Sequence, residues 1–199
     1  MSSQNVLICD GDVVKLCDFG SSHEYIRATL MSFAGTASWM APEVIRNEPV
    51  SDRADVFSFG VVMWEMITRE IPFHGFDPAT VIWQVASHRR RLCIPSSCPA
   101  PFAKLIEACW MEKPSDRPSM TEIFATLKSF QKEKRLCEET NTFIGNKNIW
   151  KIEIEKVMEN LKSLEGEMYK REVCRRSSLS ALSLSFTDPF FFSFSDRLR

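Results

Sequence analysis

The segment "KLCDFGSSHEYIRATLMSFAGTASWMAPEV", residues 15–44, concentrates side chains that could do chemistry. Asp18 directly follows a short apolar run, and a carboxylate is the kind of ligand that a hard, oxygen-seeking cation prefers. Thr29 and Ser32 lie in the middle of the segment, where phosphorylation would add negative charge that an Arg could hold. A solvated hydroxyl without any role is the alternative interpretation of both residues.

Two short β-prone runs come before this segment and position its start. Residues 6–9 (VLIC) and 13–17 (VVKLC) are joined by Asp-Gly-Asp at residues 10–12, and Asp-Gly between such runs predicts a β-hairpin. Residues 18–43 are irregular in pattern and rich in Gly, Ser and Thr, which is typical of a long functional loop. Asp18 is therefore expected where a hairpin ends and a loop begins.

From about Ser51 onward the patterns predict helices. Residues 54–67 are apolar nearly all the way round, which indicates a helix buried on every face. Asp77 and Pro78 place a capping carboxylate before a proline at the first helical position, which predicts a helix through about His88. An amphipathic stripe predicts a further helix with Phe102, Leu105, Ile106, Cys109 and Trp110. A capping box at Ser119–Glu122 predicts another, with Ile123, Leu127 and Phe130.

The composition is that of a soluble intracellular protein with one globular domain and an appendage. The 199 residues are 44% apolar and 26% charged, and the net charge of −1 gives no basic footprint for nucleic acid or for a membrane surface. The seven cysteines are odd in number and never spaced as C-x-x-C, which argues against a disulfide framework and a zinc ribbon. No leader-like N-terminus or membrane-spanning run is present, so a cytoplasmic location is predicted.

The C-terminal third separates into three predicted parts. Residues 133–146 are a linker, and residues 147–172 form a helix or short coiled coil that could mediate self-association. Residues 173–199 are rich in Ser and Phe without a helical or strand period, and they are predicted to be disordered. The heptad seam of the helix consists of Ile154, Val157, Leu161, Leu164 and Met168.

Three motifs occur in a characteristic order: Asp18-Phe19-Gly20, "GTASWMAPE" and "DVFSFGVVMWEM". Together they resemble the C-terminal lobe of eukaryotic protein kinases, over residues 5 to about 130. The strings "PFHGF", "RLCIPSSCP" and "NTFIGNKNIWKIEIEKVMENLKSLE" resemble the mixed-lineage group, and within it the leucine-zipper and sterile-alpha-motif mitogen-activated protein kinase kinase kinases. The resemblance implies a mainly α fold, in which residues 1–132 are a partial kinase domain: one β-hairpin, an activation segment and a helical core, without the N-terminal lobe.

The resemblance also implies roles at the nucleotide site. Asp18 would hold Mg²⁺ against the phosphates of ATP, and Asn5, just before the hairpin, would be a second Mg²⁺ ligand. Cys17, Phe19 and Gly20 would line the ATP pocket. A small buried apolar residue is the alternative interpretation of Cys17.

Gly35, Thr36 and Trp39 resemble the substrate loop of the serine/threonine kinases. In that family the Thr hydroxyl bonds the catalytic Asp, so Thr36 favours Ser and Thr hydroxyls of protein substrates over Tyr.

Three further residues have structural roles by resemblance. Glu43 would pair with Arg117 in a buried ion pair that joins the loop to the last helices. Asp55 would bond the backbone of the catalytic loop.

The sequence lacks several groups that phosphoryl transfer needs. The closest glycines, Gly11 and Gly20, are nine positions apart, so there is no G-x-G phosphate loop. There is also no V-A-I-K lysine and no H-R-D, so no catalytic base is assigned to this chain. General-base catalysis is typically worth about 10² to 10⁴-fold, and we therefore expect the chain alone to be inactive, with ATP and Mg²⁺ implied for a parent kinase.

Two functional hypotheses follow. In the first, the chain is a fragment or truncated form of an ATP-dependent serine/threonine kinase of stress-activated MAP kinase cascades, and the parent acts on downstream MAP kinase kinases. In the second, the chain is a non-catalytic module that binds kinase partners or substrates. The abrupt start inside a catalytic loop favours the first, and the heptad segment favours the second.

Without preceding helices, the buried helix at 54–67 is expected to leave an apolar face uncovered.

Overall fold

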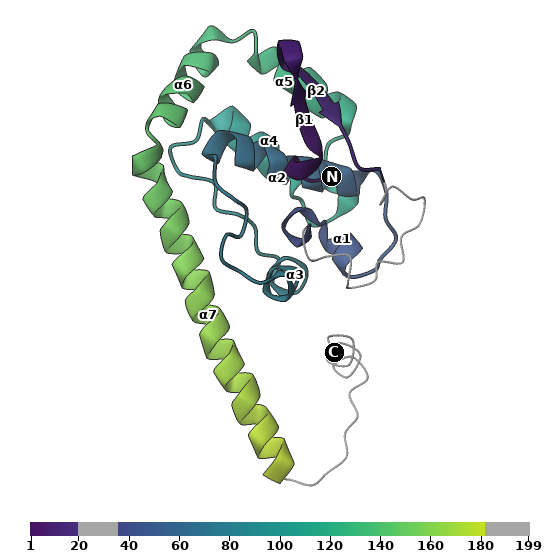
Figure 1. The fold of residues 1–199 in the computed structure, drawn as a ribbon, viewed down its shortest axis with the longest axis vertical. Helices are drawn as coiled ribbons and strands as arrows, with labels where there is room; N and C mark the ends of the chain where they lie inside the picture. The colour runs from purple at the N-terminus through teal and green to yellow at the C-terminus, as the bar shows by residue number, and fades with distance from the viewer. Residues whose placement is uncertain (20–35, 182–199) are drawn as a thin grey trace. The chain divides into compact units, whose positions relative to one another are not determined.

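The structure, a computed structural model, describes residues 1–19 and 36–181, with backbone only for residues 12, 165 and 167–181. Two compact units are present, Met1–Val157 and Met158–Arg199. Within the described residues no helix combines the length and apolar character needed to cross a membrane. The fold is mainly α, as predicted, with helices α1 (Pro42–Ile45), α2 (Arg53–Thr68), α3 (Pro78–Ala86), α4 (Ala100–Cys109), α5 (Met120–Phe130), α6 (Lys134–Gly145) and α7 (Lys147–Ala181) (Figure 1).

The predicted hairpin is present at the N-terminus. Strand β1 (Val6–Cys9) pairs antiparallel with β2 (Val13–Leu16), and Cys9 lies opposite Val13. The three residues between the strands include Gly11, whose φ of 73° lies in the left-handed region that glycine adopts without steric cost. The local turn chemistry therefore sets this register.

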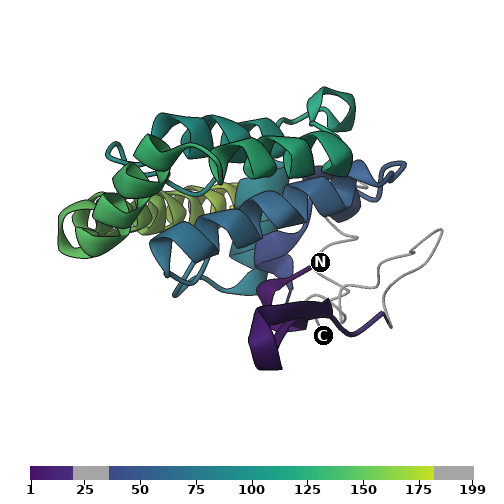
Figure 2. The ribbon, with the colours of Figure 1, turned by 90° about the horizontal axis from the view of Figure 1, so that it is seen from above.

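Helix α2 is the centre of the core. Its sequence is apolar on all sides, and most of its side chains are buried, as predicted. It contacts α4 and the short 3-10 helix η4 (Ala37–Trp39), and Figure 2 shows α2 running alongside α4. The core side chains of α2 are Val56, Phe57, Val61, Val62, Met63, Trp64 and Ile67.

Gly60 allows α2 and α4 to approach closely. A Cβ at this position would lie 2.8 Å from Cys109 Cβ and 2.7 Å from Trp110 Nε1.

We expect Gly60→Ala to lower the free energy of unfolding by about 1–3 kcal/mol, because overpacking outweighs the better helix propensity of Ala. Urea denaturation measures this change. Gly166→Ala is the control, because no atom lies within 4 Å of the added Cβ, and an equal effect of both variants would contradict the close approach.

The predicted caps start α3 and α5. The Asp77 carboxylate accepts hydrogen bonds from the N–H groups of Ala79 at 3.0 Å and Thr80 at 3.1 Å. Ser119 and Glu122 form the capping box, with both reciprocal bonds present. These side chains satisfy backbone donors that have no partner inside the helix, so the helix starts were predictable from the sequence.

The C-terminal region differs from its prediction. Residues 134–145 of the expected linker form α6, in which Leu136 and Phe143 are buried. The backbone of α7 continues to Ala181 rather than ending at residue 172, because residues 173–181 contain no Gly or Pro to stop it. Residues 182–199 lie outside the described residues. In the heptad seam, Ile154 and Leu161 are each only 6% exposed, whereas Leu164 is 42% exposed.

Candidate functional site

The two predicted Mg²⁺ ligands lie at the same end of the hairpin. The N–H of Cys17 donates to the carbonyl oxygen of Asn5 at 2.9 Å, so Asp18 directly follows a residue that is paired with Asn5. Asn5 is fixed in turn by Ser2, whose carbonyl accepts the Asn5 N–H at 3.1 Å and whose hydroxyl donates to Asn5 Oδ1 at 3.4 Å. Asp18 has a φ of 57°, a left-handed backbone at the start of the loop.

This donor set suits Mg²⁺. Asn5 offers an amide oxygen and Asp18 a carboxylate, and Mg²⁺ prefers oxygen ligands while keeping several waters and substrate phosphates. Within residues 1–19 and 36–181 no group of three or more His, Cys, Asp or Glu could hold a metal ion. Two oxygen ligands would leave the other positions of the ion to waters and phosphates, and the assignment of Asn5 and Asp18 stays a prediction.

The residues predicted to line the ATP pocket are only partly described. Cys17 is half-buried, Phe19 is 67% exposed, and Gly20 lies outside the described residues. Phe19 is one of several exposed apolar side chains in and just after the hairpin. The others are Leu7, Ile8, Val13, Val14 and Leu16, and the strand register places them on both faces of the hairpin.

The burial of α2 argues against the expected uncovered apolar face on the helix at 54–67. Most apolar side chains of α2 are buried, whereas Ala54 and Phe59 are half-buried and Met66 is 59% exposed. The contacts of α2 with α4 and η4 account for part of this burial.

The part of the predicted substrate loop that is described is anchored on α2. Trp39 is 7% exposed, and its indole Nε1 donates to Glu65 Oε2 at 2.7 Å. The hydroxyl of Ser58 donates to the Trp39 carbonyl at 2.8 Å, and that of Ser3 donates to Glu65 Oε1 at 2.9 Å. Burial raises the pKa of Glu65 above its usual value, although the bonds from Trp39 and Ser3 oppose this. Glu65 thus ties the N-terminal turn and the loop to one helix.

The sequence prediction missed Glu65. The available signal was that Glu65 is the one ionisable side chain between residues 56 and 67, where every neighbour is apolar or small. A carboxylate in a buried helix is expected to have hydrogen-bond donors near it.

Other predicted residues of this region are less constrained. Thr36 is half-buried just before η4, and Gly35, Thr29 and Ser32 lie outside the described residues. Asp55 keeps a 69% exposed side chain that lies 3.5 Å from the amino group of Met1. The roles implied for these residues by resemblance stay predictions.

The predicted ion pair between Glu43 and Arg117 is present and buried. The two guanidinium Nη atoms donate to the two carboxylate oxygens at 2.7 and 2.8 Å, with the side chains 3% and 0% exposed. The remaining N–H groups of Arg117 donate to the carbonyls of Met111, Arg53 and Glu112 at 2.8, 2.9 and 3.3 Å. All five guanidinium donors therefore have partners, the condition under which a buried pair is tolerated.

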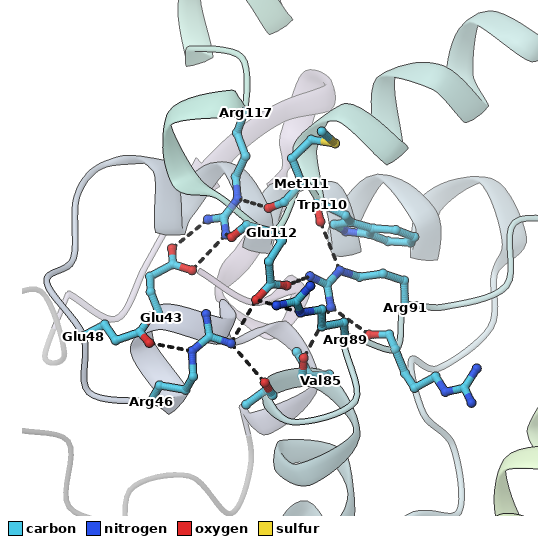
Figure 3. A network of polar contacts seen from close by, with 12 residues as sticks. Glu43, Arg46, Glu48, Val85, Arg89, Arg91, Trp110, Met111, Glu112 and Arg117 are labelled. Atoms are coloured by element: carbon cyan, nitrogen blue, oxygen red, sulfur yellow. Dashed lines mark hydrogen bonds and ion pairs between the residues drawn. The ribbon is translucent and has the colours of Figure 1, made fainter.

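A second network, centred on Glu112, lies beside this pair (Figure 3). Glu112 accepts from Arg46 Nη1 at 3.0 Å and from Arg91 Nη2 at 2.8 Å. Burial alone would raise the pKa of Glu112, but the hydrogen bonds from both arginines hold it below its usual value. Arg46 also donates to Glu48 at 2.8 Å. The network joins the ends of α1 and α3 to the segment after α4, and sequence reasoning did not find it.

The chain is similar to known protein kinases. A family model described as protein tyrosine and serine/threonine kinase matches residues 1–127. The chain is 45% identical over 172 residues to mitogen-activated protein kinase kinase kinase 12 of Rattus norvegicus, covering 86% of this chain and 19% of that protein. It is 43% identical over 180 residues to mitogen-activated protein kinase kinase kinase 13 of Mus musculus and of Homo sapiens, covering 88% of this chain and 19% and 18% of those proteins.

The chain spans about a fifth of the length of these curated relatives. The match nevertheless contains the hairpin with Asn5 and Asp18, the buried Glu43–Arg117 pair and the core helix α2. The chain therefore belongs to the protein tyrosine and serine/threonine kinase family.

Proposed function

We propose that this chain carries the metal-binding and substrate-loop part of an ATP-dependent serine/threonine kinase of the MAP kinase kinase kinase type. The observation that carries the proposal is the pairing of Asn5 with Cys17 next to Asp18, within a region that matches the kinase family. The serine/threonine form of "GTASWMAPE", with Thr36 in the loop, supports hydroxyl groups of Ser and Thr as acceptors.

In this proposal Asp18 and Asn5 would hold Mg²⁺, which when bound neutralises charge on the ATP phosphates. Ser2 and Cys17 fix the position of Asn5 through backbone and hydroxyl hydrogen bonds. Glu65 holds Trp39, so α2 would position the loop that we propose to face the protein substrate. Such positioning is most of what a protein contributes to phosphoryl transfer.

The names of the relatives suggest the substrate class. A mitogen-activated protein kinase kinase kinase is named for acting on MAP kinase kinases, and we propose these proteins as substrates, in a stress-activated cascade in the cytoplasm. Thr29 and Ser32 are proposed as phosphorylation sites of the loop, where added negative charge could bind an Arg.

A second candidate function is a non-catalytic module that binds kinase partners. The observation in its favour is that these 199 residues contain no G-x-G loop, no V-A-I-K lysine and no H-R-D. The exposed apolar side chains of the hairpin are a feature by which such a module could bind a partner. Self-association through the heptad seam has less support in this state, because Ile154 and Leu161 are already buried.

A chimeric kinase tests the first proposal. Residues 1–127 would replace the matching segment of rat mitogen-activated protein kinase kinase kinase 12, and transfer of radiolabelled phosphate to a MAP kinase kinase would be measured. We expect the chimera to be active and Asp18→Asn to lower its kcat by at least about 100-fold, because a neutral amide holds Mg²⁺ poorly.

Asp10→Asn is the matched control, since Asp10 is an exposed aspartate in the hairpin turn. It should leave kcat unchanged. A folded chimera without phosphotransfer, or equal effects of the two substitutions, would contradict the proposed function and leave the non-catalytic module as the better account.

A further inference from the structure

Helix α6 and the start of α7 pack on the kinase-family core as a brace, defined here as residues 134–157. Trp150 is 1% exposed, stacks on Phe143 with ring centroids 5.0 Å apart, and donates from its indole to the Phe143 carbonyl at 2.8 Å. Leu136 is 2% exposed and Ile154 is 6% exposed. The brace lies beyond residues 1–127, which the family model matches, but within the same compact unit.

One polar connection ties the brace to the end of α2. Lys147 Nζ lies 2.8 Å from Glu70 Oε1 and 3.5 Å from the carbonyl oxygen of Arg69, and Lys151 Nζ lies 3.7 Å from the same Glu70 oxygen. These groups are partly exposed, so we expect their ion pairs to contribute little to the free energy of unfolding.

A second connection ties the brace to the loop between α3 and α4. The backbone N–H of Ser96 donates to Glu153 Oε2 at 2.8 Å, and its hydroxyl donates to Glu153 Oε1 at 2.8 Å. A turn closed by the Cys98 N–H on the Pro95 carbonyl at 2.9 Å holds Ser96 in place. The two bonds hold the pKa of Glu153 below its usual value, so its carboxylate stays charged at neutral pH.

We propose that Ser96 is a phosphorylation site whose modification releases the brace from the core. Ser96 is exposed, so a protein kinase using ATP could reach its hydroxyl. The Ser96 oxygen would form a bond to the γ-phosphorus of ATP while the bond from that phosphorus to the bridging oxygen breaks. ADP would leave with the electron pair, and the hydroxyl proton would pass to a base of the modifying kinase.

The physical effect follows from the geometry. A phosphoserine has no hydroxyl donor for Glu153, and it adds about −1.5 to −2 charge within hydrogen-bonding range of a carboxylate. An attractive contact therefore becomes a repulsive one. The turn at residues 95–98 keeps Ser96 from moving aside, so the strain falls on Glu153 and on the helix that carries it.

Release of the brace from the core would expose a side chain of the predicted heptad seam. Ile154 is the first member of the predicted heptad seam, and in this structure it is buried within the unit that contains the brace. The same side chain cannot pack there and against another helix at once. Modification of Ser96 would thus free the seam to pair with a second copy of this chain. This inference does not depend on catalysis by the chain.

Hydrogen exchange of the full chain carrying phosphoserine at position 96 tests the proposal. We expect amide exchange in residues 147–157 to rise about three- to tenfold relative to the unmodified chain, while amides of α2 keep their protection. Unchanged exchange in residues 147–157 would overturn the proposal. Equal loss of protection in α2 would also overturn it, because the opening is then not confined to the brace.

Two control variants separate charge repulsion from other effects. Both hydrogen bonds to the Glu153 carboxylate in the described part of the chain come from Ser96, so phosphoserine at the exposed neighbour Ser97 should leave exchange in the brace unchanged. Glu153→Gln removes the carboxylate charge, so phosphoserine 96 in this background should raise exchange no more than Ser96→Ala does. A rise that persists with Glu153→Gln would show that repulsion is not the cause.

Discussion

Arg117→Ala is expected to lower the free energy of unfolding by about 3–5 kcal/mol, because it leaves a buried carboxylate without its counter-charge. Glu43 is 3% exposed at its side chain and receives both of its charge-assisted bonds from Arg117. The carbonyls of Met111 and Arg53 each lose the bond that Arg117 donates. Urea denaturation followed by helical circular dichroism measures the change.

Two comparisons separate this explanation from a general effect of losing an Arg. Arg46→Ala removes a 30% exposed guanidinium from Glu48 and Glu112, and we expect it to cost less than about 1 kcal/mol. Replacing both partners, with Glu43→Leu and Arg117→Met, should be less damaging than Arg117→Ala, since no buried charge remains. If Arg117→Ala were as mild as Arg46→Ala, the buried pair would have little part in stability.

Trp150→Ala is expected to lower the free energy of unfolding of the unit formed by residues 1–157 by about 3–5 kcal/mol. The substitution leaves a cavity where a 1% exposed indole stacked on Phe143, and it removes the bond to the Phe143 carbonyl. The result matters because Trp150 lies outside the residues that match the family model. Thermal and urea denaturation of the full chain measure it.

Ile152→Ala on the same helix is the control for this prediction. Ile152 is 65% exposed, so its truncation should change the free energy of unfolding by no more than about 0.5 kcal/mol. Equal effects at the two positions would mean that residues 134–157 behave as the linker and free helix that the sequence suggested.

The sequence predicted the elements whose signals are local. The hairpin follows from the Asp-Gly turn at residues 10–12, and the start of α3 from Asp77 and Pro78. The buried nature of α2 follows from a run of apolar residues without a polar face. Each of these features depends on neighbours within one or two turns of the chain, and such signals can be read from the order of residues.

The contacts that join distant segments were not predictable in the same way. The Ser96–Glu153 bonds span 57 positions, and the Arg46–Glu112 bond spans 66. Nothing in the local pattern of charges indicates which carboxylate an arginine will reach. The Glu43–Arg117 pair was predicted only through the family resemblance.

The Glu43–Arg117 pair also has a consequence for the order of folding. Its partners are separated by 74 positions, and the entropy of closing a long loop must be overcome before their contact forms. The backbone hydrogen bonds of α2 and of the hairpin join near neighbours in the chain, and such bonds form fast. Since both charges lose their water only when the core closes around them, we expect the pair to form late, after α2 has taken shape. The bond that joins the loop to the last helices would then be a final step of folding rather than part of its nucleus.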